Sequence, residues 1–295
     1  MKRNILCTLA FTLFFVCGCA DNAKKAFEKG VSAFQNGNFD AAIVAYTEAI
    51  RLDPKNAEAY CNRSRAYTRK GDFDKAFADC NEALRLDPKL ALAHSVRGWI
   101  YGERGNFDKA IADCSEAIGL DPKQAKAYCN RGVAYGKKGE LDKAIADLTE
   151  AIRLDPKHAE AYCSRGFAYR QKGDFDKAIA DLTEVIQLSP KYAQAYCGRG
   201  VAYGARGDFD KAITDFNEAI RFDPKDAVAY CGRGLAYGSK CEYDKAIADC
   251  TEAIRLDPKD AKAYYTRGVI CKKMGEKTKA EEDFAQAKKL GYKAL

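Results

Sequence analysis

Residues 193–226 read AQAYCGRGVAYGARGDFDKAITDFNEAIRFDPKD, and close variants of this stretch recur along the chain. Three of its four glycines, at 198, 200 and 204, resemble a loose dinucleotide-binding loop, but no strand pattern precedes them and similar segments begin at residues 127, 161 and 229. A phosphate-binding loop is therefore rejected. The prolines give the period, since all seven are 34 residues apart, at Pro54, Pro88, Pro122, Pro156, Pro190, Pro224 and Pro258. A fixed period of this length indicates a repeat protein built from one supersecondary unit.

The period divides the chain into eight repeats. Their bounds are 23–56, 57–90, 91–124, 125–158, 159–192, 193–226, 227–260 and 261–294. In the second half of repeat 6, one helical face carries Phe209, Ala212, Ile213, Phe216, Ala219 and Ile220. Asp208 can cap the start of this helix, and Asp223-Pro224 ends it. In the first half, Tyr196, Arg199, Gly200 and Tyr203 share another helical face. Each repeat is thus predicted to be a helix–turn–helix.

The repeats resemble tetratricopeptide repeats, which have conserved residue types at seven positions of a 34-residue unit. Repeat 6 supplies these as Tyr196, Gly200, Tyr203, Ala212, Phe216, Ala219 and Pro224. The resemblance implies an all-α, right-handed superhelical solenoid of eight helix–turn–helix repeats over residues 23–294. It also implies a concave groove lined by the first helices, which binds a peptide or protein segment.

The first 22 residues lie outside the repeats. Lys2 and Arg3 precede an apolar run of about 15 residues, shorter than the roughly 20 that span a bilayer, so residues 1–18 are predicted to be a signal peptide. Val16-Cys17-Gly18-Cys19 resembles the bacterial lipoprotein box. The resemblance implies lipid attachment at Cys19, a short tether over 19–22 and a membrane-anchored protein of the cell envelope. Cleavage after Ala20, giving a soluble periplasmic or secreted protein, and an uncleaved anchor remain open.

Composition restricts the function classes. The net charge of +7 is modest for 295 residues, and the lysines alternate with Asp and Glu, so nucleic acid is not expected as a partner. Only two histidines are present, and the repeats leave no insertion that carries a nucleophile and a base. We therefore expect no enzyme, no cofactor, no metal and no small-molecule substrate. A regulatory subunit of a separately encoded enzyme remains a remote alternative, as does a nucleic-acid binder.

Two charged positions recur in repeats 2 to 8. An arginine stands at Arg63, Arg97, Arg131, Arg165, Arg199, Arg233 and Arg267, and an aspartate at Asp79, Asp113, Asp147, Asp181, Asp215, Asp249 and Asp283. Repeat 1 has Lys29 and Ala45 at these positions. Pairing within each hairpin leaves no orphan, whereas pairing with the preceding repeat would strand Asp283. We predict seven structural salt bridges, with a groove-facing arginine ladder as the alternative.

The resemblance also implies the residues of the groove, from five positions of each first helix. They are Phe27, Val31 and Phe34 in repeat 1, Arg65 and Arg69 in repeat 2, Trp99 in repeat 3, Cys129 and Val133 in repeat 4, Cys163, Phe167 and Arg170 in repeat 5, Cys197 and Val201 in repeat 6, Cys231 and Leu235 in repeat 7, and Tyr265, Val269, Lys272 and Lys273 in repeat 8.

Such a narrow apolar floor with basic ends suits an extended or helical peptide that carries acidic groups. Trp99 and Phe167 are its predicted aromatic anchors, and the cysteines are predicted to be small groove-lining residues. Gly200 is expected to let the helices of its hairpin approach at Ala212, while Gly198 and Gly204 are expected to face the groove or its edge. The leading prediction is a non-enzymatic scaffold or adaptor; binding of the partner to an outer face is the alternative.

Overall fold

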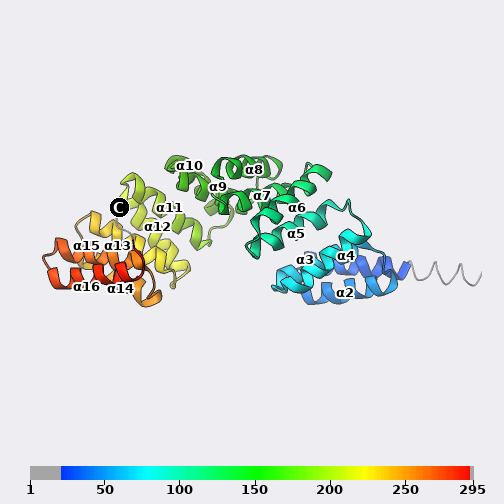
Figure 1. The fold of residues 1–295 in the computed structure, drawn as a ribbon, viewed down its shortest axis with the longest axis horizontal. Helices are drawn as coiled ribbons and strands as arrows, with labels where there is room; N and C mark the ends of the chain where they lie inside the picture. The colour runs from blue at the N-terminus through cyan, green and yellow to red at the C-terminus, as the bar shows by residue number, and fades with distance from the viewer. Residues whose placement is uncertain (1–20, 293–295) are drawn as a thin grey trace, which may run out of the picture. The chain divides into compact units, whose positions relative to one another are not determined.

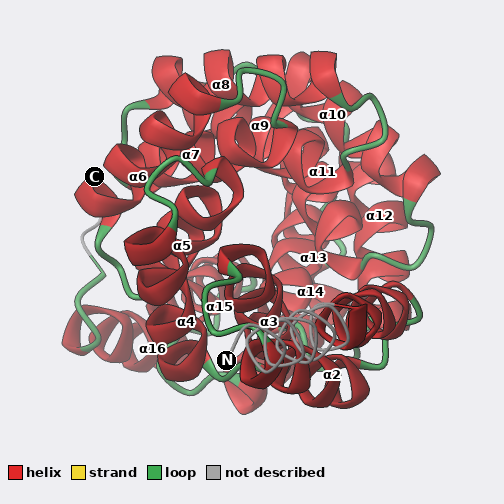
Figure 2. Ribbon diagram, turned by 90° about the vertical axis from the view of Figure 1, so that its right-hand side faces the viewer, coloured by secondary structure: helices red, strands yellow, loops and turns green. Residues whose placement is uncertain are grey.

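The computed structural model describes residues 21–292, and every regular element in this range is a helix (Figure 2). The prediction of an all-α solenoid of 34-residue helical hairpins is confirmed. The predicted signal peptide 1–18 and the predicted lipid-attachment residue Cys19 lie outside the described residues.

Each repeat contributes a first and a second helix. The first helices are residues 21–35, α3 (Ala57–Lys70), α5 (Ala91–Glu103), α7 (Ala125–Lys137), α9 (Ala159–Lys172), α11 (Ala193–Arg206), α13 (Ala227–Ser239) and α15 (Ala261–Lys273). The second helices are α2 (Phe39–Leu52), α4 (Phe73–Leu86), α6 (Phe107–Leu120), α8 (Leu141–Leu154), α10 (Phe175–Leu188), α12 (Phe209–Phe222), α14 (Tyr243–Leu256) and α16 (Lys277–Lys289).

The chain divides into two compact units, Met1–Leu154 and Asp155–Leu295, and four helical hairpins are described in each (Figure 1). Within a unit, every first helix packs on the second helix of its own hairpin, as α11 does on α12. The second helix in turn packs on the first helix of the following hairpin, and successive first helices such as α11 and α13 also touch. This stacking places the first helices of each unit side by side, which makes their shared surface the one to search for a binding site.

Local signals in the sequence set the ends of the helices. Asn38, Asp72 and Asn106 cap the second helices of their repeats, and the side chain of each accepts a hydrogen bond from a backbone amide three residues later. The turn between the two helices has a glycine at positive φ in most repeats, for example Gly207 at 87°. Cys241 occupies this turn in repeat 7 at a φ of 62° and is the one non-glycine residue at positive φ among residues 21–292.

Small residues allow the two helices of a hairpin to approach closely. A Cβ atom added at Gly132 would lie 2.8 Å from Leu148 Cγ and 3.1 Å from the carbonyl oxygen of Ala144. In repeat 2 the equivalent residue is Ser64, whose hydroxyl is within hydrogen-bond distance, 2.9 Å, of Cys80 Sγ. The close approach depends on a small side chain at this position because the second helix leaves no room for a larger one.

Three glycine predictions need correction in detail. A Cβ added at Gly200 would first meet the ring of Phe216, at 3.0 Å, rather than Ala212. Gly204 faces Ala212 on the second helix of its own hairpin, so its predicted orientation toward the groove is wrong. Gly198 is buried, and a Cβ there would lie 2.7 Å from the Phe167 ring of the preceding repeat. These glycines fit between helices that are already in contact.

Candidate functional site

Seven buried ion pairs hold the hairpins in a fixed geometry. In repeats 2 to 8 the arginine donates from Nε and Nη2 to the two carboxylate oxygens of the aspartate in its own hairpin, at 2.7 to 2.8 Å. The aspartates are only 4 to 9% exposed. The bond to the carboxylate raises the pKa of each arginine, for example Arg199, against the opposing effect of burial. The pairs lie between helices, so these arginines act on the structure rather than on a ligand.

The third nitrogen of the guanidinium makes a contact that sequence reasoning missed. Nη1 donates to a polar side chain on the second helix of the preceding repeat. The pairs within the two units are Arg63–Thr47, Arg97–Asn81, Arg131–Ser115, Arg199–Thr183, Arg233–Asn217 and Arg267–Thr251, at 2.7 to 3.1 Å. The sequence could have indicated this contact, because the position of the acceptor on the second helix holds Thr, Asn or Ser in each of these repeats. One arginine thus ties its own hairpin together and joins it to the hairpin before.

The cysteines predicted to line the groove are core residues, so that prediction is wrong for Cys129, Cys163, Cys197 and Cys231. Their exposed fractions are 1%, 6%, 7% and 3%. Cys231, for example, packs with Ala253 on α14, the second helix of the same repeat, and with Ala263 on α15, the first helix of the following repeat. The side chain at this position projects into the space between three helices, where a small apolar group fits and a ligand cannot reach.

In the unit Met1–Leu154, most of the predicted groove residues are half-buried by neighbouring side chains. Phe27 and Val31 pack into the core clusters around Tyr46, and the Arg65 guanidinium lies 4.7 Å from the ring centre of Phe34. Trp99 packs on Phe73, with the ring centres 5.6 Å apart. The other two predicted residues here, Val133 and Arg69, are half-buried and exposed respectively. This surface offers partly covered aromatic rings rather than free apolar side chains.

In the unit Asp155–Leu295, α13 presents two large apolar side chains that are about half exposed. Val228 is 59% exposed and Leu235 is 48% exposed, and they lie two helical turns apart on one face. Tyr192, at the start of α11, is 41% exposed. Leu235 was a predicted groove residue, whereas Val228 and Tyr192 were missed. Val228 could have been predicted from the sequence, because it stands at one of the five first-helix positions that the family resemblance assigns to the groove.

Half-buried residues on the neighbouring first helices extend this surface. Val201 on α11 and Val269 on α15 stand at the position that Leu235 occupies on α13, and Phe167 stands there on α9. We name the surface formed by Phe167, Tyr192, Val201, Val228, Leu235 and Val269 the α13 patch.

Cations border the α13 patch. The Arg170 guanidinium lies 5.3 Å from the ring centre of Phe167, and Lys262, Lys272 and Lys273 are exposed on α15. The nearby carboxylates of Asp226 and Asp260 accept hydrogen bonds from backbone amides at the starts of α13 and α15. These two acids are therefore already engaged as helix caps, while the lysines extend into solvent.

The predicted groove residue Tyr265 is occupied by intramolecular packing. Its ring stacks on Tyr292 with centres 4.3 Å apart and an angle of 22°, and it also touches Phe284 at 5.6 Å. The residues that follow α16 therefore cover the side of Tyr265 that was expected to face a ligand.

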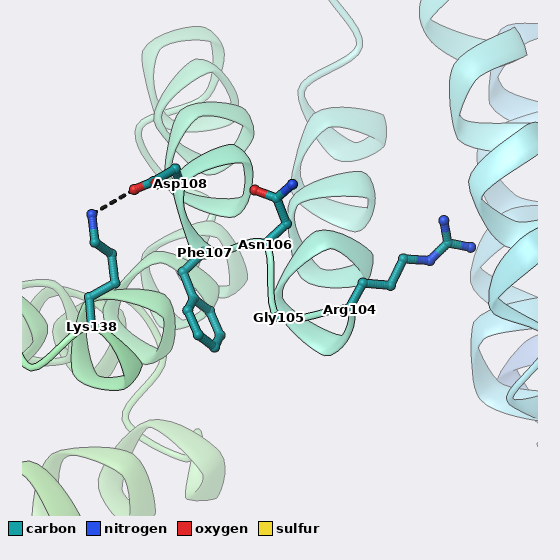
Figure 3. Close-up of a pocket in the computed structure, with 6 residues that line it drawn as sticks. All are labelled: Arg104, Gly105, Asn106, Phe107, Asp108 and Lys138. Atoms are coloured by element: carbon teal, nitrogen blue, oxygen red, sulfur yellow. Dashed lines mark hydrogen bonds and ion pairs between the residues drawn. The ribbon is translucent and has the colours of Figure 1, made fainter.

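A hollow of about 380 Å³ lies at the hairpin turn of repeat 3, away from the first-helix surface (Figure 3). Lys138 donates to Asp108 at 2.6 Å, and Arg104 points away from this pair, toward Asp74, which it contacts at 2.5 Å. Both cations already have carboxylate partners from the preceding repeat. This hollow is a consequence of the inter-repeat ion pairs and offers no free charge to a ligand.

Comparison with known proteins agrees with the fold. Family models described as tetratricopeptide repeat match residues 27–91, 125–158, 193–226, 227–260, 148–180 and 250–282, and one described as TPR repeat matches 98–139 and 168–205. Three of these matches, 125–158, 193–226 and 227–260, coincide with the bounds of repeats 4, 6 and 7. The chain belongs to the tetratricopeptide repeat family.

Solved structures of tetratricopeptide repeat proteins are similar to this chain. A tetratricopeptide repeat protein from Parabacteroides merdae is 27% identical with a TM-score of 0.60, and the match covers 80% of this chain and 93% of that one. MamA is 32% identical with a TM-score of 0.51, over 56% of this chain and 96% of that one. YrrB, described as a TPR protein with an unusual peptide-binding site, is 24% identical with a TM-score of 0.50, over 63% and 95%, and shows the fold alone.

The fold is that of an interaction scaffold, and the matched families are not catalytic ones. Within residues 21–292, no helix combines the length and the hydropathy needed to cross a membrane.

Proposed function

We propose that this protein is a non-enzymatic scaffold that binds a peptide or protein segment on the α13 patch. The observation that carries the proposal is the exposure of Val228 and Leu235, at 59% and 48%, on one face of a first helix. Folded monomers seldom leave neighbouring large apolar side chains uncovered unless a partner buries them. Stacked helices with such a stripe suit a segment that lays apolar side chains across them.

The border of the α13 patch indicates the chemistry of the segment. Arg170 lies beside Phe167, and Lys262, Lys272 and Lys273 are exposed on α15, whereas Asp226 and Asp260 are engaged as helix caps and Glu160 is the exposed acid beside Tyr192. A segment with apolar residues flanked by Asp or Glu complements this arrangement, because opposite charges at the rim favour encounter and the apolar contacts favour retention. The patch differs from the predicted groove, since the predicted anchors were Trp99 and Phe167, whereas the most exposed apolar side chains of the patch are Val228 and Leu235.

The test compares exposed valines on two different surfaces. Val228→Ser combined with Leu235→Ser removes the apolar stripe, whereas Val44→Ser changes a valine that is 70% exposed on the second helix α2. Crosslinking capture from cells should lose its partner with the double variant and keep it with Val44→Ser. Equal capture by wild type and the double variant would contradict the proposal. Loss with Val44→Ser alone would favour the outer-face alternative.

We also propose that the chain is exported and tethered to the bacterial envelope by a lipid on Cys19. The support is the sequence Val16-Cys17-Gly18-Cys19 after a short apolar run that follows Lys2 and Arg3. Labelling with radioactive palmitate should mark wild type and should disappear in Cys19→Ala. Label that persists in Cys19→Ala, or that never appears in wild type, would overturn the lipid anchor and leave the soluble secreted protein and the uncleaved anchor as the alternatives.

A further inference from the structure

Repeat 3 has a histidine where repeats 2 and 4 to 8 have a tyrosine. His94 replaces the aromatic residue found as Tyr60, Tyr128, Tyr162, Tyr196, Tyr230 and Tyr264. In repeat 6 the Tyr196 hydroxyl donates to the carbonyl oxygen of Pro190, 3.1 Å away. His94 uses the equivalent acceptor, since its Nε2 lies 3.0 Å from the carbonyl oxygen of Pro88. The histidine therefore keeps the contact of the tyrosine with the preceding turn.

The second ring nitrogen of His94 gives the imidazole a further partner. Nδ1 lies 3.4 Å from Oδ1 of Asp113, the aspartate that also accepts two bonds from Arg97. The two side chains are 13% and 12% exposed. A neutral imidazole has one N–H and one lone pair, so it would turn a lone pair toward one of these two oxygens. The imidazolium form alone donates to both.

Repeat 3 differs from its neighbours at a second, complementary position. An arginine lies near the tyrosine on the second helix of the same repeat in four repeats, in the pairs Tyr60–Arg85, Tyr128–Arg153, Tyr196–Arg221 and Tyr230–Arg255. Repeat 5, which keeps Tyr162, has Gln187 at the position of the arginine. In repeat 3 the residue at the position of this arginine is Gly119, and a Cβ atom added there would have no neighbour within 4 Å. The repeat that acquires a group able to become cationic therefore lacks the cation that would repel it.

The groups acting on His94 come from three elements. They are Asp113 on α6, Arg97 on α5 itself and the carbonyl of Pro88 in the turn before α5. The hydrogen bond to Asp113 is the largest effect and raises the pKa of His94, while partial burial and Arg97 oppose it. Burial raises the pKa of Asp113, but its bonds to Arg97 and His94 outweigh this and hold that pKa below its ordinary value.

We propose that His94 is a proton-dependent clamp, which in its imidazolium form ties the turn at Pro88 to Asp113 of α6 and so tightens the junction between repeats 2 and 3. Because the folded pKa of His94 is raised, the clamp contributes stability that is fully present below the unfolded pKa of about 6.5 and is lost as pH rises through the folded pKa. The stack of hairpins up to Leu154 thereby gains stability at acidic pH, which a tyrosine at this position would not provide.

The experiment uses the full chain with one histidine. His158→Gln removes the only other imidazole and places there the residue found at the equivalent position of the preceding repeat, Gln124. Nuclear magnetic resonance titration of the remaining imidazole should give a pKa above about 6.5. Adding Gly119→Arg, which restores the arginine of other repeats, should lower that pKa. A value at or below about 6.5, or one that Gly119→Arg leaves unchanged, would overturn the proposal.

A stability measurement tests the clamp independently of the titration. His94→Tyr, made in the same His158→Gln background, keeps the bond to Pro88 and loses the titrating group. The melting temperature of the histidine protein relative to His94→Tyr should fall as pH rises from about 5 to about 8, across the range in which histidine titrates. Parallel curves for the two proteins over this range would show that His94 does not act as a clamp.

Discussion

Removal of one carboxylate from the buried ion pairs should destabilise the solenoid far more than removal of a surface carboxylate on the same helix. In Asp215→Ala, the Arg199 guanidinium loses both acceptors of its Nε and Nη2 groups and keeps only the 3.0 Å bond from Nη1 to Thr183. The Asp215 side chain is 6% exposed and that of Arg199 is 17% exposed, so little water replaces the carboxylate. Breaking a buried pair in this way costs about 3–5 kcal/mol, and we expect the lower end because the arginine is partly accessible.

The matched control is Asp210→Ala on the same helix, α12. Asp210 pairs with Lys240, but its side chain is 83% exposed, and an exposed pair contributes about 0–1 kcal/mol. Urea unfolding followed by circular dichroism gives the midpoints. Hydrogen exchange of the α11 and α12 amides then locates the loss, since a long repeat array need not unfold in one step. A midpoint for Asp215→Ala equal to that for Asp210→Ala would refute the structural role of the pairs.

Three further predictions follow from backbone geometry and burial. Gly132→Ala should destabilise the fold because its Cβ would meet Leu148 at 2.8 Å, whereas Gly136→Ala, whose Cβ would be 3.8 Å from the nearest side chain, should stabilise it by about 0.5–1 kcal/mol in the same urea assay. Cys241→Gly should raise the urea midpoint, since glycine adopts a φ of 62° without strain. Of the ten described thiols, only that of Cys241 is exposed, so a thiol reagent should modify it rapidly and the others only on unfolding. Rapid modification of any of the other nine described thiols in native Cys241→Ser protein would contradict their burial.

The sequence alone was sufficient to predict the repeat boundaries and the partners in the ion pairs. Pro, Ala and Tyr recur at the same spacing in most repeats, which gives those repeats the same helix ends and the same contact face, so periodicity alone predicts the hairpin. The Arg–Asp assignment followed from the count of charges, because Ala45 and Lys29 in repeat 1 leave one pairing scheme without orphans. Both arguments depend on comparisons between repeats of the same chain.

The same reasoning failed where a side chain lies between two neighbouring repeats. Helical periodicity predicts that Cys231 and Leu235 share a face of α13. It does not predict that α15, the first helix of the following repeat, covers Cys231 and leaves Leu235 exposed. In the structure Cys231 is 3% exposed and Leu235 is 48% exposed. Gly198 shows a related limit, since its environment depends on the size of Phe167 in the preceding repeat. Such positions require the angle at which the helices stack, which no single repeat encodes.

Many free thiols are unusual in a protein exported to an oxidising compartment, which is an objection to the proposed export. Burial of the thiols removes this objection. Thiol chemistry proceeds through the thiolate, and burial raises the pKa of Cys163 and Cys231 to about 11 and those of Cys80, Cys114 and Cys197 to about 12. At neutral pH a thiol with a pKa of about 11 is ionised in roughly one molecule in ten thousand, and the surrounding helices exclude an oxidant as well. Nine of the ten described cysteines therefore serve as small apolar core residues, and among these ten, oxidation in an envelope compartment would be confined to Cys241 until a hairpin opens.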